Sequence, residues 1–97
     1  MTIDKEFSDG KLTLKVGGRL DTNTSPELES ALVYDGVSEI VFDFSGLEYI
    51  ASAGLRVLMT AQKAMMAAGG KVLIFQPNDM VRGILDMTGL SGVFEIA

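Results

Sequence analysis

The fold of this chain is indicated by one stretch, Ser45-Gly-Leu-Glu-Tyr-Ile-Ala-Ser52-Ala-Gly54-Leu-Arg-Val-Leu-Met59. It follows an apolar run, Ile40-Val-Phe-Asp-Phe44, and leads into an Ala- and Met-rich run that ends at Gly69-Gly70. The pattern predicts a strand, a loop and a helix, with Ser52 at the junction of the loop and the helix. Serine is a favoured N-cap residue, because its hydroxyl can accept a hydrogen bond from the free amides of the first turn. A phosphate on this hydroxyl would lie at the positive end of the helix, which tolerates negative charge.

The predicted strand, residues 40–44, is apolar except for Asp43, and a continuous apolar strand is typical of a sheet covered on both faces. We expect the Asp43 carboxylate to have a structural role, accepting hydrogen bonds from loop amides near Ser52. The helix after Ser52 is predicted to run from Gly54 to about Ala68. Five apolar residues are expected on its buried face: Leu55, Leu58, Met59, Met65 and Met66. Gln62 falls in the middle of this face without an evident reason.

Two strands joined by a tight turn are predicted at the N-terminus. The runs at residues 2–7 and 11–17 flank Asp9-Gly10, and an Asp-Gly pair between alternating runs is a strong hairpin signal. We expect Gly17-Gly18 to end the second strand, so that residues 19–24 form a polar loop.

The next helix can begin in two ways. Ser25 can be the N-cap with Pro26 as the first helical residue, or Thr24 and Glu27 can form a capping box. Leu28, with Ala31 and Leu32, would give this helix its core stripe.

The C-terminal third predicts a strand, a helix and a final strand. Residues 71–75 form the strand, Asn78 can cap a short helix that Gly89 stops, and residues 93–97 form the last strand. The whole order is strand, strand, helix, strand, helix, strand, helix, strand. It predicts a single α/β domain over residues 1–97, built as one mixed sheet with packed helices.

The composition excludes several classes of function. The 97 residues carry a net charge of −5, whereas nucleic-acid binding needs a basic face. The chain has no Cys and no His, so it lacks the commonest nucleophile, general base and metal ligands, and we expect no enzyme, metal site or cofactor. No apolar run reaches the roughly 20 residues of a membrane span, and the N-terminus has no signal-peptide pattern. A cytoplasmic protein is therefore expected.

Several motifs together resemble STAS domains of the anti-sigma factor antagonist type. The segments are Gly18-Arg-Leu-Asp21, Asp43-Phe-Ser45, Tyr49-Ile-Ala-Ser52-Ala-Gly54-Leu-Arg-Val-Leu58, Gly69-Gly-Lys-Val-Leu-Ile-Phe75 and Val81-Arg-Gly-Ile-Leu-Asp-Met-Thr-Gly89-Leu90. Each segment alone is weak, but their order and spacing together cover nearly the whole chain. The resemblance implies the same α/β layout.

The resemblance also implies a function. An anti-sigma factor antagonist binds an anti-sigma factor that is a serine kinase of the GHKL type, and so releases a sigma factor. The kinase phosphorylates the residue at the place of Ser52, which ends the complex, and a serine phosphatase resets it. The implied partner-binding residues are Asp21, Asn23, Ala51, Ser52, Ala53, Gly54 and Arg56.

Alternatives remain open at these positions. Ser52 can be a plain N-cap, and Asp21 can belong to a solvated turn. The family often has Asp and Ser or Thr beside the phosphorylated residue, where this chain has Ala51 and Ala53. The second functional hypothesis is therefore an unswitched STAS adaptor, such as the cytoplasmic subunit of a lipid-transport ABC system.

Overall fold

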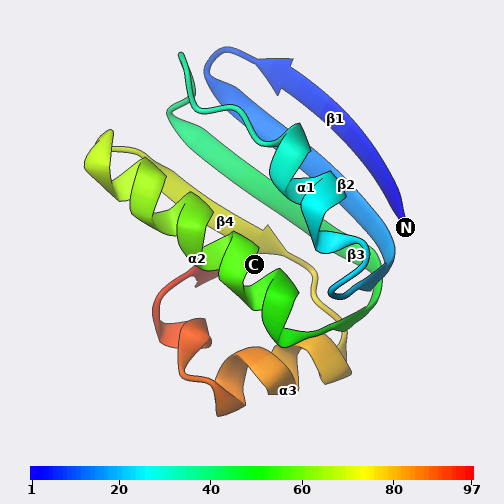
Figure 1. Cartoon of the computed structure of the whole chain (residues 1–97). Coiled ribbons are helices and arrows are strands. Elements are labelled where there is room, and N and C mark those ends of the chain that lie inside the picture. The colour runs from blue at the N-terminus through cyan, green and yellow to red at the C-terminus, as the bar shows by residue number, and fades with distance from the viewer.

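The computed structural model describes residues 1–97 as a five-stranded sheet with three α-helices (Figure 1). The elements are β1 (Thr2–Ser8), β2 (Lys11–Leu20), α1 (Ser25–Ala31), β3 (Glu39–Ile50), α2 (Ser52–Ala67), β4 (Lys71–Phe75), α3 (Asp79–Met87), the 3₁₀ turn η1 (Leu90–Gly92) and β5 (Glu95–Ile96). The strand order in the sheet is β1-β2-β3-β4-β5, with β1 antiparallel to β2 and the other neighbours parallel. The predicted mixed α/β sheet and its element order are confirmed.

The N-terminal hairpin forms as predicted. Asp9 and Gly10 have φ angles of 51° and 80°, so both central residues of the turn are left-handed, as a two-residue type I′ turn requires. The turn sets the register of the hairpin, in which Ser8 lies opposite Lys11. Strand β1 is one of the two edge strands of the sheet, and most of its side chains are exposed.

The prediction that Gly17-Gly18 ends the second strand is wrong. Strand β2 continues to Leu20, and the two glycines lie in a bulge where the register against β3 shifts. Gly18 has a φ of +89°, a conformation that glycine adopts without steric cost. The glycines therefore kink the strand and let it continue.

This continuation corrects the boundary of β3 as well. The strand was expected to end at Phe44, but it runs to Ile50, because the second half of β2 supplies hydrogen-bonding partners for it. Leu20 at the end of β2 lies opposite Ile50. The predicted loop before the long helix is reduced to one residue, Ala51, and the strand delivers the chain directly to Ser52.

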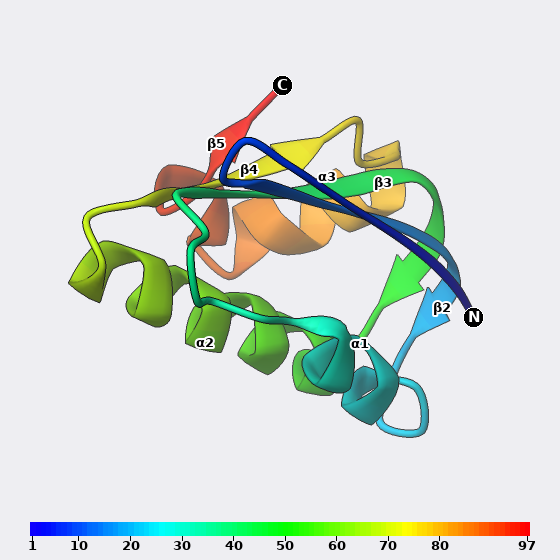
Figure 2. The ribbon, with the colours of Figure 1, turned by 90° about the horizontal axis from the view of Figure 1, so that it is seen from above.

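All three α-helices cover the same face of the sheet (Figure 2). Each step from β2 to β5 moves to the next parallel strand in the same direction, and right-handed crossovers then place every connecting helix on one side. The expectation of a sheet covered on both faces is therefore wrong. The central residue Val41 is only 6% exposed on the open face, where its neighbours across the sheet are Thr13 and Leu73.

Helix α2 packs on the sheet with a different set of residues from the predicted one. Leu58 and Met65 are fully buried as expected, and Leu55 and Met59 are partly buried. Met66 is 66% exposed, because it lies about 100° around the helix from Met65. The remaining buried positions of α2 are Gly54, Val57 and Ala61.

Gln62 joins α2 to the C-terminal segment. Its side-chain nitrogen Nε2 donates to the carbonyl oxygen of Val93 over 3.3 Å. This contact is the reason for a polar residue near the apolar face of α2. The other side-chain atom, Oε1, is buried without a partner in the chain.

The predicted helix stops and the Asn78 cap are confirmed. Gly69 has a φ of +75°, and the amides of Gly69 and Gly70 donate to the carbonyls of Met66 and Met65, which is a Schellman motif. Asn78 Oδ1 accepts a hydrogen bond from the amide of Val81 over 2.8 Å. A left-handed Gly89 follows α3, as expected.

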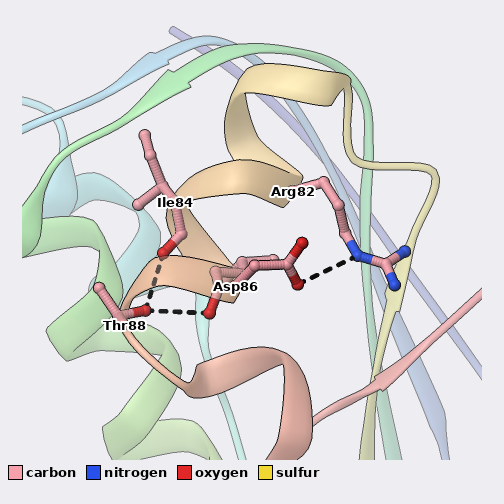
Figure 3. Close-up of polar contacts among 5 residues, drawn as sticks. Arg82, Ile84, Asp86 and Thr88 are labelled. Carbon is pink, nitrogen blue, oxygen red and sulfur yellow. Dashed lines mark hydrogen bonds and ion pairs between the residues drawn. The ribbon is translucent and has the colours of Figure 1, made fainter.

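Polar contacts close the C-terminal end of α3 (Figure 3). The hydroxyl of Thr88 donates to the carbonyl of Ile84 over 2.9 Å, and Arg82 Nε lies 3.6 Å from Asp86 Oδ1.

The last strand was predicted at residues 93–97 but is limited to Glu95–Ile96. None of the helices is both long enough and apolar enough to span a membrane.

Candidate functional site

The end of β2 and the start of α2 are joined by a backbone hydrogen bond. The amide of Ala51 donates to the carbonyl oxygen of Leu20 over 2.8 Å. Asp21 directly follows Leu20, and Ser52 directly follows Ala51. The bond therefore places the turn after β2 beside the first turn of α2. Two motifs that lie 31 residues apart in the chain therefore share one end of the sheet.

Ser52 is the first residue of α2, and its side chain is exposed. The prediction that it caps the helix is wrong: the N-cap position is Ala51, which has extended backbone angles and no side-chain oxygen. The first amides of α2 are therefore left without a side-chain cap. An exposed hydroxyl beside uncapped amides is a favourable place for an added anion.

The turn after β2 is held by Asp21. Its Oδ1 accepts hydrogen bonds from the amides of Asn23 and Thr24 over 3.0 and 3.1 Å, and the Thr24 hydroxyl oxygen lies 3.2 Å from it. The backbone carbonyl of Asp21 accepts from the amide and the hydroxyl of Ser25 over 2.8 and 2.6 Å. These contacts make an Asx-type turn, in which the carboxylate organises the start of α1.

The same hydrogen bonds change the ionisation of Asp21. The pKa of its carboxyl group is lowered, first by the hydrogen bond from the amide of Thr24, with smaller contributions from the Thr24 hydroxyl, the Asn23 amide and the charge of Arg19. Partial desolvation acts in the opposite direction. The net effect favours the charged form of Asp21, which accepts the hydrogen bonds of the turn, over its protonated form.

Neither predicted start of α1 forms as expected. Ser25 is the first residue of the helix, with Pro26 in its first turn, and Thr24 occupies the N-cap position without a side-chain cap bond. The Thr24 hydroxyl is engaged elsewhere, accepting from the amide of Asp21 over 2.9 Å and donating to the carbonyl of Arg19 over 2.8 Å. In the core stripe of this helix, Leu28 is fully buried and Ala31 is partly buried.

The other predicted site residues lie around this junction at different depths. Asn23 is exposed in the turn, and Arg56 is exposed one helical turn after Ser52. Ala53 is half-buried and lines the groove between α1 and α2. Gly54 is buried, so it contributes to the shape of the helix start rather than to an exposed surface.

A shallow groove runs between α1 and α2 beside Ser52. Its lining consists of Thr22, Ser25, Pro26, Glu29, Ala53, Arg56, Val57 and Thr60. The groove thus carries one acidic side chain from α1 and one basic side chain from α2. Its lining residues on α2 follow Ser52 along the helix, from Ala53 to Thr60.

The expected position of the Asp43 contacts is wrong. Asp43 is half-buried, and its Oδ1 accepts from the amide of Ser45 over 3.0 Å, within β3 and next to the bulge rather than near Ser52. The carboxylate therefore stabilises the irregular part of the strand. Its role is structural, as predicted, but at another place.

Two features of this end of the sheet were not predicted. The guanidinium carbon of Arg19 lies 4.5 Å from the ring centroid of Tyr49, an arrangement that makes a cation–π contact between β2 and β3. Asn78 Nδ2 donates to the carbonyl of Leu47 over 3.0 Å, which fixes α3 to the extended part of β3. Both contacts require that the second half of β3 is a strand. They were not predicted, because the sequence analysis placed a loop there.

Comparison with known proteins gives relatives that match along the whole chain. BtrV of Bordetella bronchiseptica is 30% identical over 100 residues, with 100% of this chain and 84% of that protein covered. The anti-sigma-B factor antagonist of Staphylococcus aureus is 28% identical over 99 residues, with 99% of this chain and 92% of that protein covered.

Solved structures show the same fold. SpoIIAA from Bacillus, an anti-sigma factor antagonist, matches in its unphosphorylated form with a TM-score of 0.87 and 18% identity, covering 99% of this chain and 88% of that one. Its phosphorylated form matches with a TM-score of 0.78 and 18% identity over 99% of this chain and 91% of that one. The model of the STAS domain family matches residues 2–97, and the chain belongs to that family.

Proposed function

We propose that this protein is an anti-sigma factor antagonist, acting as a single domain over residues 1–97 in the cytoplasm. In its unphosphorylated form it binds an anti-sigma factor that is also a serine kinase of the GHKL type, and so releases a sigma factor. Phosphorylation of Ser52 ends this complex, and a serine phosphatase restores it. The protein is a regulatory binding partner and not an enzyme.

The observation that carries the proposal is the position of Ser52. Its exposed hydroxyl stands at the first residue of α2, beside the Asp21 turn and the groove between α1 and α2. The relative from Staphylococcus aureus is named as an anti-sigma-B factor antagonist, and SpoIIAA has been solved in phosphorylated and unphosphorylated forms. The proposed interface contains Asp21, Asn23, Ser52 and Arg56, with Ala51, Ala53 and Gly54 forming the helix start.

The transfer step needs no group from this chain except the Ser52 hydroxyl. The hydroxyl oxygen attacks the γ-phosphorus of ATP, the bond to the β-phosphate oxygen breaks, and ADP leaves. The hydroxyl proton passes to a base of the kinase. The product carries about −1.5 to −2 added charge at neutral pH.

The added charge has opposite effects on the free domain and on the complex. In the free domain, the phosphate is solvated at a helix N-terminus, where the helix dipole favours negative charge. In the complex, the same phosphate would be buried against the partner, and an unpaired buried charge is costly. The modification therefore separates the partners and leaves the fold unchanged.

Phosphate transfer by the cognate kinase tests the proposal directly. Incubation with the kinase and ATP is expected to add one phosphate to the wild type, detected by intact mass, and none to Ser52→Ala. Ser45→Ala is the matched control, because Ser45 is also an exposed serine in the segment that leads to α2. Labelling of Ser52→Ala to the wild-type level would reject Ser52 as the modified residue, and a wild type that takes up no phosphate would favour the unswitched adaptor.

A further inference from the structure

Ser52 and Arg56 lie one turn apart on the same face of α2. The helix is continuous from Ser52 to Ala67, and both side chains are exposed. Residues four apart in an α-helix have their Cβ atoms about 5–6 Å from each other. The guanidinium of Arg56 can therefore reach a group attached to the Ser52 oxygen.

Arg56 has no carboxylate partner that would compete for it. The two ion pairs of the structure are Lys71–Glu39 and Arg82–Asp86, and neither involves Arg56. Glu29 lines the same groove from α1, but it is not within ion-pair distance of the Arg56 side chain. The polar contact that Arg56 makes uses its backbone, whose carbonyl accepts a hydrogen bond from the Thr60 hydroxyl over 3.0 Å.

Helix α3 already contains a pair with this spacing. Arg82 and Asp86 are four residues apart, both are about half exposed, and Arg82 Nε lies 3.6 Å from Asp86 Oδ1 (Figure 3). A helical pair is more favourable when the acidic residue precedes the basic one. A phosphate on Ser52 followed by Arg56 has this better order, and it carries more charge than a carboxylate.

We propose that Arg56 pairs with the phosphate of phosphorylated Ser52 within the same chain, which rests on the proposed phosphorylation of that residue. The pairing has two consequences for the switch. It stabilises the phosphorylated free domain, and it withdraws a basic side chain from the groove that the partner would contact. Arg56 is thus a positioning residue for the phosphate.

Titration of the phosphate separates this pairing from a structural role of Arg56. Phosphoserine is installed at position 52 by genetic encoding, so that no kinase is needed, and its second pKa is followed by ³¹P NMR at low salt. A nearby cation favours the dianion, so Arg56→Gln should raise this pKa by about 0.3 unit, as a typical helical ion pair implies. Arg56→Lys should restore most of the shift, whereas Lys63→Gln, an exposed change further along α2, should have no effect.

The charges of Asp21, Arg19 and Glu29 near this end of the molecule are the same in every variant, so they cancel in the comparison. Equal phosphate pKa values in Arg56→Gln and Lys63→Gln would overturn the pairing, even if the kinase labels Ser52. Conversely, a kinase that leaves Ser52 unmodified would reject the proposed function without changing the titration result. The two proposals can therefore fail separately.

Discussion

A Cβ atom placed on Gly54 would lie 2.7 Å from Cγ of Leu20. It would also lie 2.9 Å from Cγ1 of Ile50. The first turn of α2 therefore touches the ends of β2 and β3 so closely that only glycine fits at this position. The contact sets the distance between Ser52 and the Asp21 turn.

Two glycines in helices make a matched test of this contact. Gly54→Ala should lower the free energy of unfolding by about 1–3 kcal/mol, because the added methyl group overpacks the core. Gly83→Ala in α3 should raise it by up to about 1 kcal/mol, because a Cβ there meets no atom within 4 Å and alanine favours the helix. Urea unfolding measures both changes, and a common sign for the two variants would contradict the packing described here.

The uncapped start of α2 predicts a stabilising substitution. Ala51 has φ −100° and ψ 175°, which suits an N-cap residue, but its side chain cannot accept a hydrogen bond. Ala51→Asp should therefore raise the free energy of unfolding by about 1 kcal/mol, measured by urea denaturation at neutral pH. Ala53→Asp, a control that adds the same charge inside the first turn, should give less; an equal gain would assign the effect to charge alone.

Substitutions at Ser52 should separate folding from binding. Because Ser52 is exposed and is not the N-cap, Ser52→Ala should change stability by no more than about 0.5 kcal/mol and keep the partner bound. Ser52→Asp should also fold, since a carboxylate is favourable in the first turn, but should bind poorly because its charge must lose water in the interface. Calorimetric titration with the cognate kinase measures the binding of both variants, and tight binding by Ser52→Asp would favour the adaptor.

The lowered pKa of Asp21 predicts a pH dependence of stability. Its folded pKa lies below the ordinary value of 3.8, so the unfolded chain takes up the proton more readily. The stabilisation is fully present above pH 3.8 and is lost as the pH falls through the folded pKa. Asp21→Asn removes this titration while keeping one oxygen acceptor for the turn.

Urea unfolding at a series of pH values between neutral and strongly acidic conditions checks this. The difference in unfolding free energy between wild type and Asp21→Asn should shrink as the pH falls below about 4. A constant difference over the series would show that the carboxylate charge does not support the turn. At neutral pH, the same variant should weaken partner binding more than it changes stability, since Asp21 belongs to the proposed interface.

The packing of α2 predicts unequal effects for two of its apolar residues. Leu58 is fully buried, so Leu58→Ala should lower the free energy of unfolding by about 2–5 kcal/mol through lost contacts and a cavity. Met66 is 66% exposed, so Met66→Ala should change it by less than about 0.5 kcal/mol. Denaturant midpoints compare them, and a similar loss for both would contradict the rotation of α2 described here.

Local chemistry in the sequence was enough to predict the element order, the Asp9-Gly10 turn and the Asn78 cap. The errors lie where one strand depends on another. Gly17-Gly18 favours a break, yet the strand continues, because β3 pairs with the residues beyond the bulge. The boundary of β3, the single-residue link at Ala51 and the loss of the Ser52 cap all follow from that pairing, which periodicity within one segment does not reveal.

The candidate site was predictable to a similar degree. The sequence motifs placed Ser52 at a helix start and Asp21 in a turn, whereas their proximity depends on the hydrogen bond between Ala51 and Leu20. The partner of Gln62 is Val93, 31 residues away, and no local pattern indicates such a contact. Long-range backbone pairing is therefore the part that sequence reasoning missed.

The free edge strand β1 carries protection against pairing with its own copy. Two copies could extend the sheet by pairing their β1 strands antiparallel around a two-fold axis. The registers that pair the most residues have the axis at Asp4, Lys5 or Glu6. Each register places a charged side chain opposite the identical side chain of the other copy, and like charges directly opposite are destabilising. The sequence Asp4-Lys-Glu6 thus disfavours edge-to-edge pairing of two copies through this strand.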